Sequence, residues 1–329
     1  MPELVSLLPV LFLILAAEFV NGWTDAPNAI ATVVSTRVLS PYRALLMATV
    51  FNFLGTLSGV AVASTIGKGI IEAESVTLVT VGAAMVGIVI WSSVAAYYGI
   101  PTSESHALVA GLAGAALATA GPEILLAAGW KKVGIGLICS TFFGFFGGYL
   151  IMVSIYWLFR RAIPAKVSAL FRTLQVFSAS FMAFAHGSND GQKFMGMFTL
   201  ALVLGGVLET FAIPLWVKII CAAVMAVGTA TGGWRIVRTM GISMTKLEPV
   251  HGFAAETAAA TVIETASRLG IPLSTTHTIN TAIMGVGATR RLSAVRWGVT
   301  FEIIAAWFLT FPVCGSISWL CAKLFHLIF

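Results

Sequence analysis

At residues 21–29 the chain reads NGWTDAPNA, a polar stretch inside an apolar run that begins near Leu4 and continues to Thr36. An apolar run of roughly 20 residues predicts a membrane span. Asp25 therefore lies at a depth where an ionised carboxylate costs from about 2.5 to more than 10 kcal/mol and is functional by default. A second stretch, HGSNDGQK at residues 186–193, places Asp190 in a similar apolar context. We interpret the two stretches as two halves of one site.

The composition is that of a membrane protein. Of 329 residues, 58% are hydrophobic and only 10% are charged, whereas soluble domains carry roughly 25% charged residues. The net charge of +6 comes from short basic clusters between apolar runs, which is typical of topology signals and not of a nucleic-acid-binding surface. The four cysteines all lie in apolar runs without ligand partners at metal spacing, so they predict neither a disulfide framework nor a metal site.

The apolar runs predict an all-α, polytopic membrane protein with about 10–12 membrane segments. We predict a first repeat over residues 1–160, a short cytoplasmic linker over 161–168 and a second repeat over 169–329, all in one membrane domain. Twelve Lys and Arg residues then fall on the cytoplasmic side, and three, Lys68, Lys131 and Lys132, fall on the other. This positive-inside bias predicts a multi-pass protein of the cytoplasmic (inner) membrane with both termini outside.

Three pairs of motifs recur in the same order in the two halves. IPTSESH at 100–106 matches IPLSTTH at 271–277 with an offset of 171, GTLSG at 55–59 matches GTATG at 228–232 with an offset of 173, and Asp25 matches Asp190 with an offset of 165. If each half crosses the membrane an odd number of times, the repeats are inverted. Inverted repeats with discontinuous helices, and a substrate held between them near the midplane, are typical of secondary transporters.

The residues around the two aspartates indicate a coupling-cation site. Gly22 and Pro27 flank Asp25, and Gly187 and Gly191 flank Asp190, which favours broken helices with free carbonyls at these points. Hard oxygen donors of this kind suit Na⁺ or a carboxylate that exchanges a proton. The predicted cation ligands are Thr24, Asp25, Asn28, Asn189 and Asp190, with a possible Na⁺ at Asp25 and Asp190. The alternative is that each aspartate caps a half-helix or pairs with an intramembrane base such as Lys193.

The duplicated Pro-containing motifs indicate an anion cradle. Pro101 and Pro272 favour the first turn of a helix, so the Ser and Thr residues that follow lie near helix N-termini, where free N–H groups attract oxyanions. The hydroxyl donors are those of Ser103, Ser105, Ser274, Thr275 and Thr276. The alternative for each motif is an ordinary N-cap.

Further polar residues near these motifs are predicted as accessory groups. His106 and His277 hold equivalent places and either contact the ligand or are satisfied by a neighbouring carbonyl. Glu256 and Glu264 have no acidic counterpart in the first half, and they either bind an extra cation, pair with a base or face a partner chain. The predicted accessory residues are Glu104, His106, Gln192, Lys193, Glu256 and His277.

These motifs resemble the inorganic phosphate transporter (PiT) family, in particular its bacterial and archaeal low-affinity permeases. The family has a duplicated G-x-N-D-x-x-N-A type signature and paired P-x-S-T-T-H segments, and the resemblance covers essentially the whole chain. It implies cation-coupled phosphate uptake by paired helical hairpins, no enzymatic activity, no tightly bound cofactor and a homodimer in the bilayer. The phosphate-binding residues that it implies are Asp25, Asn28, Ser103, Ser105, Asn189, Asp190, Ser274, Thr275 and Thr276.

The chain departs from the family pattern at a few of these positions. Thr24 resembles the branch associated with proton coupling, so Na⁺ and H⁺ both stay open as the coupling ion. Pro27 and Gly191 stand where small Ala-like residues are usual. Glu104, beside the anion cradle, would repel the substrate if it were ionised and pointed inward.

Three other functions fit the sequence less well than coupled phosphate uptake. Hydrogen phosphate has an O–H to donate to Asp25 or Asp190, whereas sulfate has none, so phosphate is favoured over a sulfate permease of the same fold. A passive anion channel would not need paired acids. An intramembrane hydrolase could use Ser188 near His186, but catalytic pairs usually come from separate elements and need no duplication.

Overall fold

The computed structural model describes residues 2–70 and 76–328, and in them the chain is all-helical, as predicted. The helices of the first half are α1 (Pro2–Ser35), α2 (Pro41–Leu57), α3 (Ala61–Gly69), α4 (Leu78–Tyr98), α5 (Glu104–Thr119) and α6 (Ala127–Leu158). Those of the second half are α7 (Pro164–Leu204), α8 (Leu215–Thr231), α9 (Trp234–Arg238), α10 (Pro249–Arg268), α11 (Thr275–Ala288) and α12 (Trp297–Ile328). Short helical turns lie at Pro122–Ile124, Thr239–Ser243 and Leu292–Ala294.

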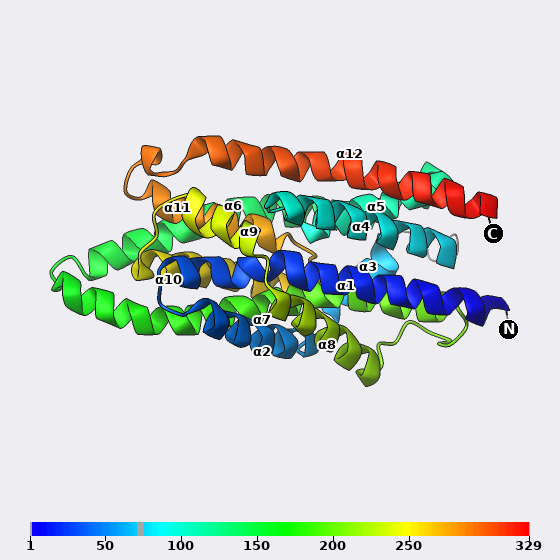
Figure 1. Ribbon diagram of the computed structural model, residues 1–329, viewed down its shortest axis with the longest axis horizontal. Helices are drawn as coiled ribbons and strands as arrows, with labels where there is room; N and C mark the ends of the chain where they lie inside the picture. Colours follow the sequence, from blue (N-terminus) through cyan, green and yellow to red (C-terminus); the bar gives the residue numbers. More distant parts are fainter. Residues whose placement is uncertain (1, 71–75, 329) are drawn as a thin grey trace.

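The two halves have matching helices that run in opposite directions. In Figure 1, α1 leads away from the end of the molecule that holds both termini, and α7 leads back towards it. The pairing of helices is also exchanged, because α1 packs on α8 as α7 packs on α2, and α5 packs on α12 as α11 packs on α6. This arrangement confirms the predicted inverted repeats. α7 begins at Pro164, inside the predicted linker, since proline is well tolerated in the first turn of a helix.

Long apolar helices provide the membrane spans. Five helices of the described chain, namely α1, α4, α6, α7 and α12, are long and apolar enough to cross a membrane. The number rises to seven if two bent pairs each count as one span, α2 with α3 (66°) and α8 with the segment Trp234–Ser243 (62°). The breaks fall at the duplicated GTLSG and GTATG motifs. The predicted broken helices therefore exist, but they are not the helices that carry the aspartates.

Two helical hairpins enter the molecule from opposite ends. α4 and α5 lie in the half of the molecule that holds the termini, and α10 and α11 lie in the other half (Figure 1). Their tips are joined by a hydrogen bond from Ser274 Oγ to Ser103 Oγ (2.8 Å) and by one from Ser105 Oγ to the Leu273 carbonyl (2.8 Å). The paired hairpins predicted for the fold therefore meet, with residues 103–105 of one tip against 273–274 of the other.

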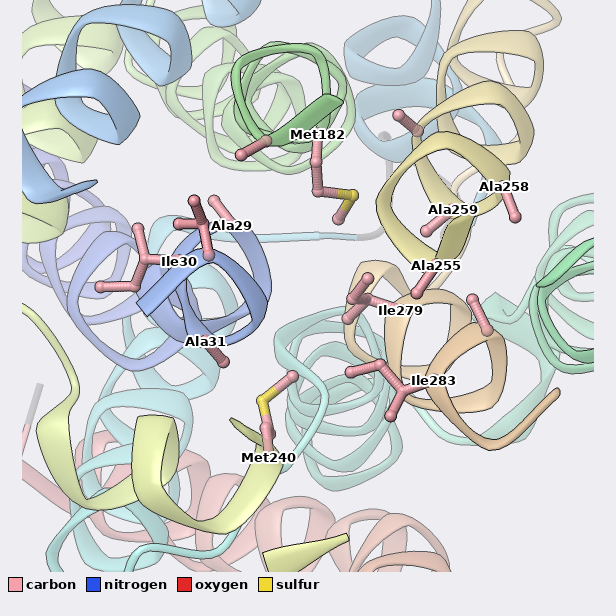
Figure 2. Close-up of a cluster of buried hydrophobic side chains, with 14 of the residues drawn as sticks. Ala29, Ile30, Ala31, Met182, Met240, Ala255, Ala258, Ala259, Ile279 and Ile283 are labelled. Carbon is pink, nitrogen blue, oxygen red and sulfur yellow. The ribbon is translucent and has the colours of Figure 1, made fainter. Parts of the chain in front are cut away.

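Apolar side chains pack into two clusters, one towards each end of the molecule. The cluster at the termini includes Leu7, Ile14 and Ala17 of α1. The other cluster includes Ala29, Ile30 and Ala31 of α1, and Figure 2 shows these residues together with Met182, Ile279 and Ile283 of neighbouring helices. The polar segment of α1 lies between the clusters, so the site described next has an apolar cluster on each side.

Candidate functional site

The two aspartates lie together at the centre of the molecule, from neighbouring helices. Asp25 of α1 is 3% exposed and Asp190 of α7 is 1% exposed. His186, one turn before Asp190, places its Nε2 3.4 Å from Asp190 Oδ2 and 3.8 Å from Asp25 Oδ2. Its Nδ1 lies 3.0 Å from Asn52 Oδ1 of α2, which fixes the ring orientation. Pairing two acids in a buried place requires a compensating positive charge.

The helices that carry the aspartates are continuous, so the prediction that they break at Asp25 and Asp190 is wrong. α1 and α7 remain helical through both motifs. The glycines allow close packing instead: a Cβ on Gly22 would meet the Met225 carbonyl of α8, and a Cβ on Gly187 would meet the Asn52 carbonyl of α2. The ligands offered by α1 and α7 are therefore side chains and not unwound backbone carbonyls.

The hairpin tip of α10 and α11 supplies hydroxyls to both aspartates. Thr275 Oγ1 donates to Asp190 Oδ2 (2.8 Å), and Thr276 Oγ1 donates to Asp25 Oδ2 (3.3 Å). Asn28 of α1 donates to the hydroxyls of Thr276 (3.0 Å) and Thr275 (3.4 Å). Three of the predicted substrate ligands, Asn28, Thr275 and Thr276, thus surround the paired acids.

The hairpin tip of α4 and α5 makes the corresponding contact with α7. Lys193 donates to Asp190, to Ser105 Oγ (2.5 Å) and to the Leu273 carbonyl (2.9 Å). By the offsets of 165 and 171, Lys193 corresponds to Asn28 and Ser105 corresponds to Thr276. The contacts of Asn28 with Thr276 and of Lys193 with Ser105 are therefore equivalent, but the second half places an ammonium where the first half has an amide.

Ser103 and Ser274 cap helices, as the alternative interpretation of the Pro-containing motifs expects. The Ser103 hydroxyl accepts from the His106 amide (3.3 Å), and the Ser274 hydroxyl accepts from the His277 amide (3.1 Å). Pro101 and Pro272 precede these caps by two residues, so they lie outside the first helical turn. The caps still direct the N-terminal ends of α5 and α11 towards the paired acids.

The remaining predicted ligands lie around the pair. Thr24 and Ser92 donate to the buried Glu104 carboxylate (2.9 and 2.8 Å), which is therefore directed towards α1 and α4. Asn189 donates to Ser267 of α10 (2.9 Å). Gln192 accepts from the Val62 amide at the start of α3 (3.0 Å).

Three of the predicted accessory residues make their contacts away from the aspartates. Glu256 is fully buried and accepts from Thr32 (2.5 Å), Gln175 (3.1 Å) and Ser178, so it forms a separate polar cluster. The His106 and His277 rings are 4.4 Å apart, and His277 stacks on Trp307 (3.6 Å).

His186 is the central residue that sequence reasoning did not assign to the site. Its position four residues before Asp190 puts both on one face of α7, and that spacing could have identified it. The repeat comparison did not point to it, because the equivalent position in α1 is Asn21.

The donor set around Asp25 fits a small hard cation. Asp25, Asn28 and Thr276 carry carboxylate, amide and hydroxyl oxygens, the ligand atoms that Na⁺ prefers. Ligand atoms of Asp25, His186 and Asp190 all lie within 4.8 Å of one another. Asp190, in contrast, already contacts the ammonium of Lys193.

Inverted halves, hairpins that meet at buried acids and apolar closure on both sides together define a membrane carrier. The family described as "Phosphate transporter family" matches the chain twice, over residues 21–166 and 159–318. The chain belongs to this family, and it is a membrane transporter rather than an enzyme. The double match also follows the two halves seen in the structure.

Known proteins are similar over the full length of the chain. A probable low-affinity inorganic phosphate transporter of Rhizobium meliloti (strain 1021) is 47% identical over 322 residues, which are 97% of this chain and 96% of that protein. A protein of the same description from Bacillus subtilis (strain 168) is 37% identical over 333 residues, which are 99% of this chain and 100% of that protein. A solved structure described as the sodium-dependent phosphate transporter superimposes with a TM-score of 0.91 at 23% identity, covering 99% of this chain and 100% of that one. That likeness establishes the fold.

Proposed function

We propose that the protein imports inorganic phosphate together with a cation by alternating access. The observation that carries the proposal is the meeting of two hairpin tips, from opposite ends, at the buried pair Asp25 and Asp190. Both aspartates are almost inaccessible to water, and both face hydroxyls that can turn to a substrate oxygen. A site of this kind can open to one side at a time if one hairpin moves while the other stays closed.

The anion binds between the hydroxyls of the tips and the two acids. Thr275, Thr276 and Ser105 present hydroxyls, and Lys193 presents an ammonium that can pair with a phosphate oxygen. Hydrogen phosphate can in addition donate its O–H to an aspartate oxygen, which sulfate cannot do. This favours phosphate, with sulfate as the competing substrate to test.

The cation binds on the Asp25 side of the site. Asp25, Asn28, Thr24 and Thr276 provide carboxylate, amide and hydroxyl oxygens there, whereas Lys193 already balances Asp190. Lys193 thus serves as a fixed cation in the second half, and the first half takes a mobile one, Na⁺ or H⁺. Binding of the mobile cation neutralises Asp25 before the loaded site changes sides.

Uptake of labelled phosphate into liposomes that contain the purified protein tests the function. Uptake is measured under a sodium gradient, under a pH gradient and without a gradient, each with and without excess sulfate. We expect accumulation that follows one gradient and resists sulfate, and its loss in Asp25→Asn. Glu209→Gln, which removes an exposed carboxylate from the connection before α8, is the matched control.

The other outcomes of this experiment are distinct. Accumulation of labelled sulfate instead of phosphate would make the protein a sulfate carrier. Phosphate that only equilibrates, with conductance, would indicate a channel. Retained coupled uptake in Asp25→Asn would exclude Asp25 as the coupling residue.

The same proposal includes orientation and assembly. Both termini lie at one end of the molecule (Figure 1). The positive-inside bias of the sequence supports an orientation in which that end faces the outer side of the cytoplasmic membrane. The protein acts as a homodimer, as the family resemblance implies. Impermeant labelling of cysteines added at each end, and the mass of the detergent-purified particle, test these two points.

A further inference from the structure

α1 carries a second buried acid that the proposed site does not use. Glu18 lies seven residues before Asp25 and is 0% exposed, as is Asn21 one turn later. Asn21 Nδ2 donates to Glu18 Oε2 (3.3 Å). A carboxyl group at this depth is expensive and marks a functional position by default.

Two oxygens of this pair have no hydrogen-bond partner. Glu18 Oε1 and Asn21 Oδ1 are both buried and unpaired, although a buried unpaired polar atom costs about 1–3 kcal/mol. Among the described residues, no Lys, Arg or His forms an ion pair with Glu18. Two unpaired acceptors on side chains that are hydrogen-bonded to each other are an arrangement that a bound cation or a shared proton would satisfy.

The surroundings of Glu18 contain few other charges. The charged groups near enough to act on it are Asp190 and Lys193 of α7 and Glu104 of α5, and the Cys221 thiol of α8 is the titratable neighbour on that helix. Ile14 and Ala17, both 0% exposed, belong to the apolar cluster on the side of the termini. The pair is thus isolated from water and from any fixed counter-ion in direct contact.

The pair belongs to a polar stripe on α1. The stripe consists of buried polar residues at spacings of three and four, which places them on one helix face: Glu18, Asn21, Asp25, Asn28 and Thr32. The equivalent positions on α7, at the offset of 165, are Ala183, His186, Asp190, Lys193 and Met197. The α1 stripe therefore offers neutral amides, hydroxyls and acids, whereas the α7 stripe offers two basic residues and apolar ends.

We propose that Glu18 and Asn21 form a binding site for a monovalent cation, between the end of the molecule that holds the termini and Asp25. The ligand is a hard cation, Na⁺ or a proton, held by Glu18 Oε1 and Asn21 Oδ1. This inference rests on the proposed coupled uptake, in which the mobile cation binds at Glu18 and Asn21 before it reaches Asp25. Because α7 has Ala183 at the position of Glu18, the second half has no equivalent acid at this position.

Cation binding is measured first without transport, as the thermal stability of the detergent-purified protein. NaCl is titrated against choline chloride at constant ionic strength, and a parallel series varies pH. A cation that binds only the folded protein stabilises it by RT ln(1 + c/Kd), where c is the cation concentration, so the stabilisation sets in as c approaches Kd. We expect Glu18→Gln to raise the cation concentration at which stabilisation sets in about tenfold or more, the loss expected for a contact with a charged group. The series, NaCl or pH, in which the stability of Glu18→Gln responds differently from that of the wild type identifies the cation.

Two further variants keep the test decisive. Asn21→Ala keeps the acid and removes the unpaired amide oxygen, so it should weaken the same cation response if Glu18→Gln does not fold. Glu209→Gln, in the exposed connection before α8, removes an acid elsewhere and should match the wild type. An unchanged response in Glu18→Gln and Asn21→Ala, in both series, would overturn the site.

Transport then separates this inference from the proposed function. In liposomes, Glu18→Gln should need a correspondingly higher cation concentration for net uptake, while exchange of labelled for unlabelled phosphate at saturating cation continues. A wild type that does not accumulate phosphate contradicts the proposed function but leaves the stability experiment valid. A wild type that accumulates phosphate, with the same cation dependence in Glu18→Gln, contradicts the site alone.

Discussion

Asn28 and Lys193 hold equivalent positions in the two halves, yet one side chain is neutral and the other is a cation. Lys193→Asn should open a place for a second mobile cation beside Asp190, because the ammonium that now contacts this carboxylate is gone. We expect one more cation per transported phosphate in this variant. The measurement is the charge moved per labelled phosphate in proteoliposomes.

The reciprocal change provides the control. Asn28→Lys should remove the mobile cation, and the double variant with both changes should return to the wild-type ratio because the total charge of the site is restored. If Lys193→Asn transports with the wild-type ratio, Lys193 does not serve as a fixed cation.

The duplicated motifs made several residues of the site predictable from the sequence. Asp25, Asp190, Thr275 and Thr276 were expected to lie together because each motif occurs twice, and the structure brings them into contact. Their roles in binding phosphate and cation stay predictions. The repeat comparison did not identify His186 as a site residue, because the equivalent position in α1 is Asn21. The Asn189 side chain points towards Ser267, a direction that depends on helix packing and cannot be read from one sequence.

Close helix packing gives a prediction at the scale of elements. A Cβ on Gly187 would meet the Asn52 carbonyl, and a Cβ on Gly22 would meet the Met225 carbonyl. Gly187→Ala and Gly22→Ala should therefore destabilise the protein by about 1–3 kcal/mol through overpacking. Gly134 of α6 has nothing within 4 Å of its Cβ position, so Gly134→Ala should be neutral or stabilising. Thermal unfolding in detergent distinguishes them, and equal effects at the three positions would contradict the packing argument.

The start of α10 gives a pH-dependent prediction. Glu248 caps this helix together with His251, and it accepts a hydrogen bond from Arg290 (2.7 Å), which lowers the pKa of Glu248. The stabilisation is present above the ordinary carboxyl pKa of about 4.3 and is lost as the pH falls through the lower folded value. Glu248→Ala loses the cap as well as the charge and should cost about 1 kcal/mol. Glu248→Gln should cost less, since the pair is exposed.

The unfolding temperature measured from neutral to acidic pH checks this prediction. The difference between wild type and Glu248→Gln should shrink towards zero at acidic pH, where Glu248 is protonated in both folded and unfolded chains. A difference that is constant with pH would exclude an ionic contribution from Arg290.

The helices were predictable as elements, but their breaks were not. Gly and Pro near Asp25 and Asp190 suggested discontinuities, whereas the bends occur after Leu57 and Thr231. Pro27 is tolerated inside α1, where Gly233 lies against its ring and against the Trp23 carbonyl. A glycine that breaks a helix and a glycine that admits a neighbouring helix look the same in a sequence, and only the partner helix decides between them.

The contact between the two hairpin tips gives a prediction for the whole molecule. Ser103 and Ser274 come from opposite hairpins and share a hydrogen bond of 2.8 Å. Alternating access requires the tips to separate, so oxidation of the Ser103→Cys/Ser274→Cys double variant should block phosphate uptake, and a reductant should restore it. The single variants under the same oxidant control for the native cysteines. Full transport with a formed cross-link would show that the tips move as one body.

The exchanged pairing of helices between the halves has an energetic consequence. If the first half adopts the conformation of the second and the second that of the first, the result faces the other side of the membrane and reuses the same kinds of contacts, such as glycine against carbonyl and hydroxyl against aspartate. Two such conformations are nearly equal in free energy wherever the halves agree. The difference between them must then come from positions where the halves disagree, with Glu18 opposite Ala183 and Asn28 opposite Lys193 foremost among them. Such differing positions, rather than the shared motifs, set which side of the membrane the empty carrier faces.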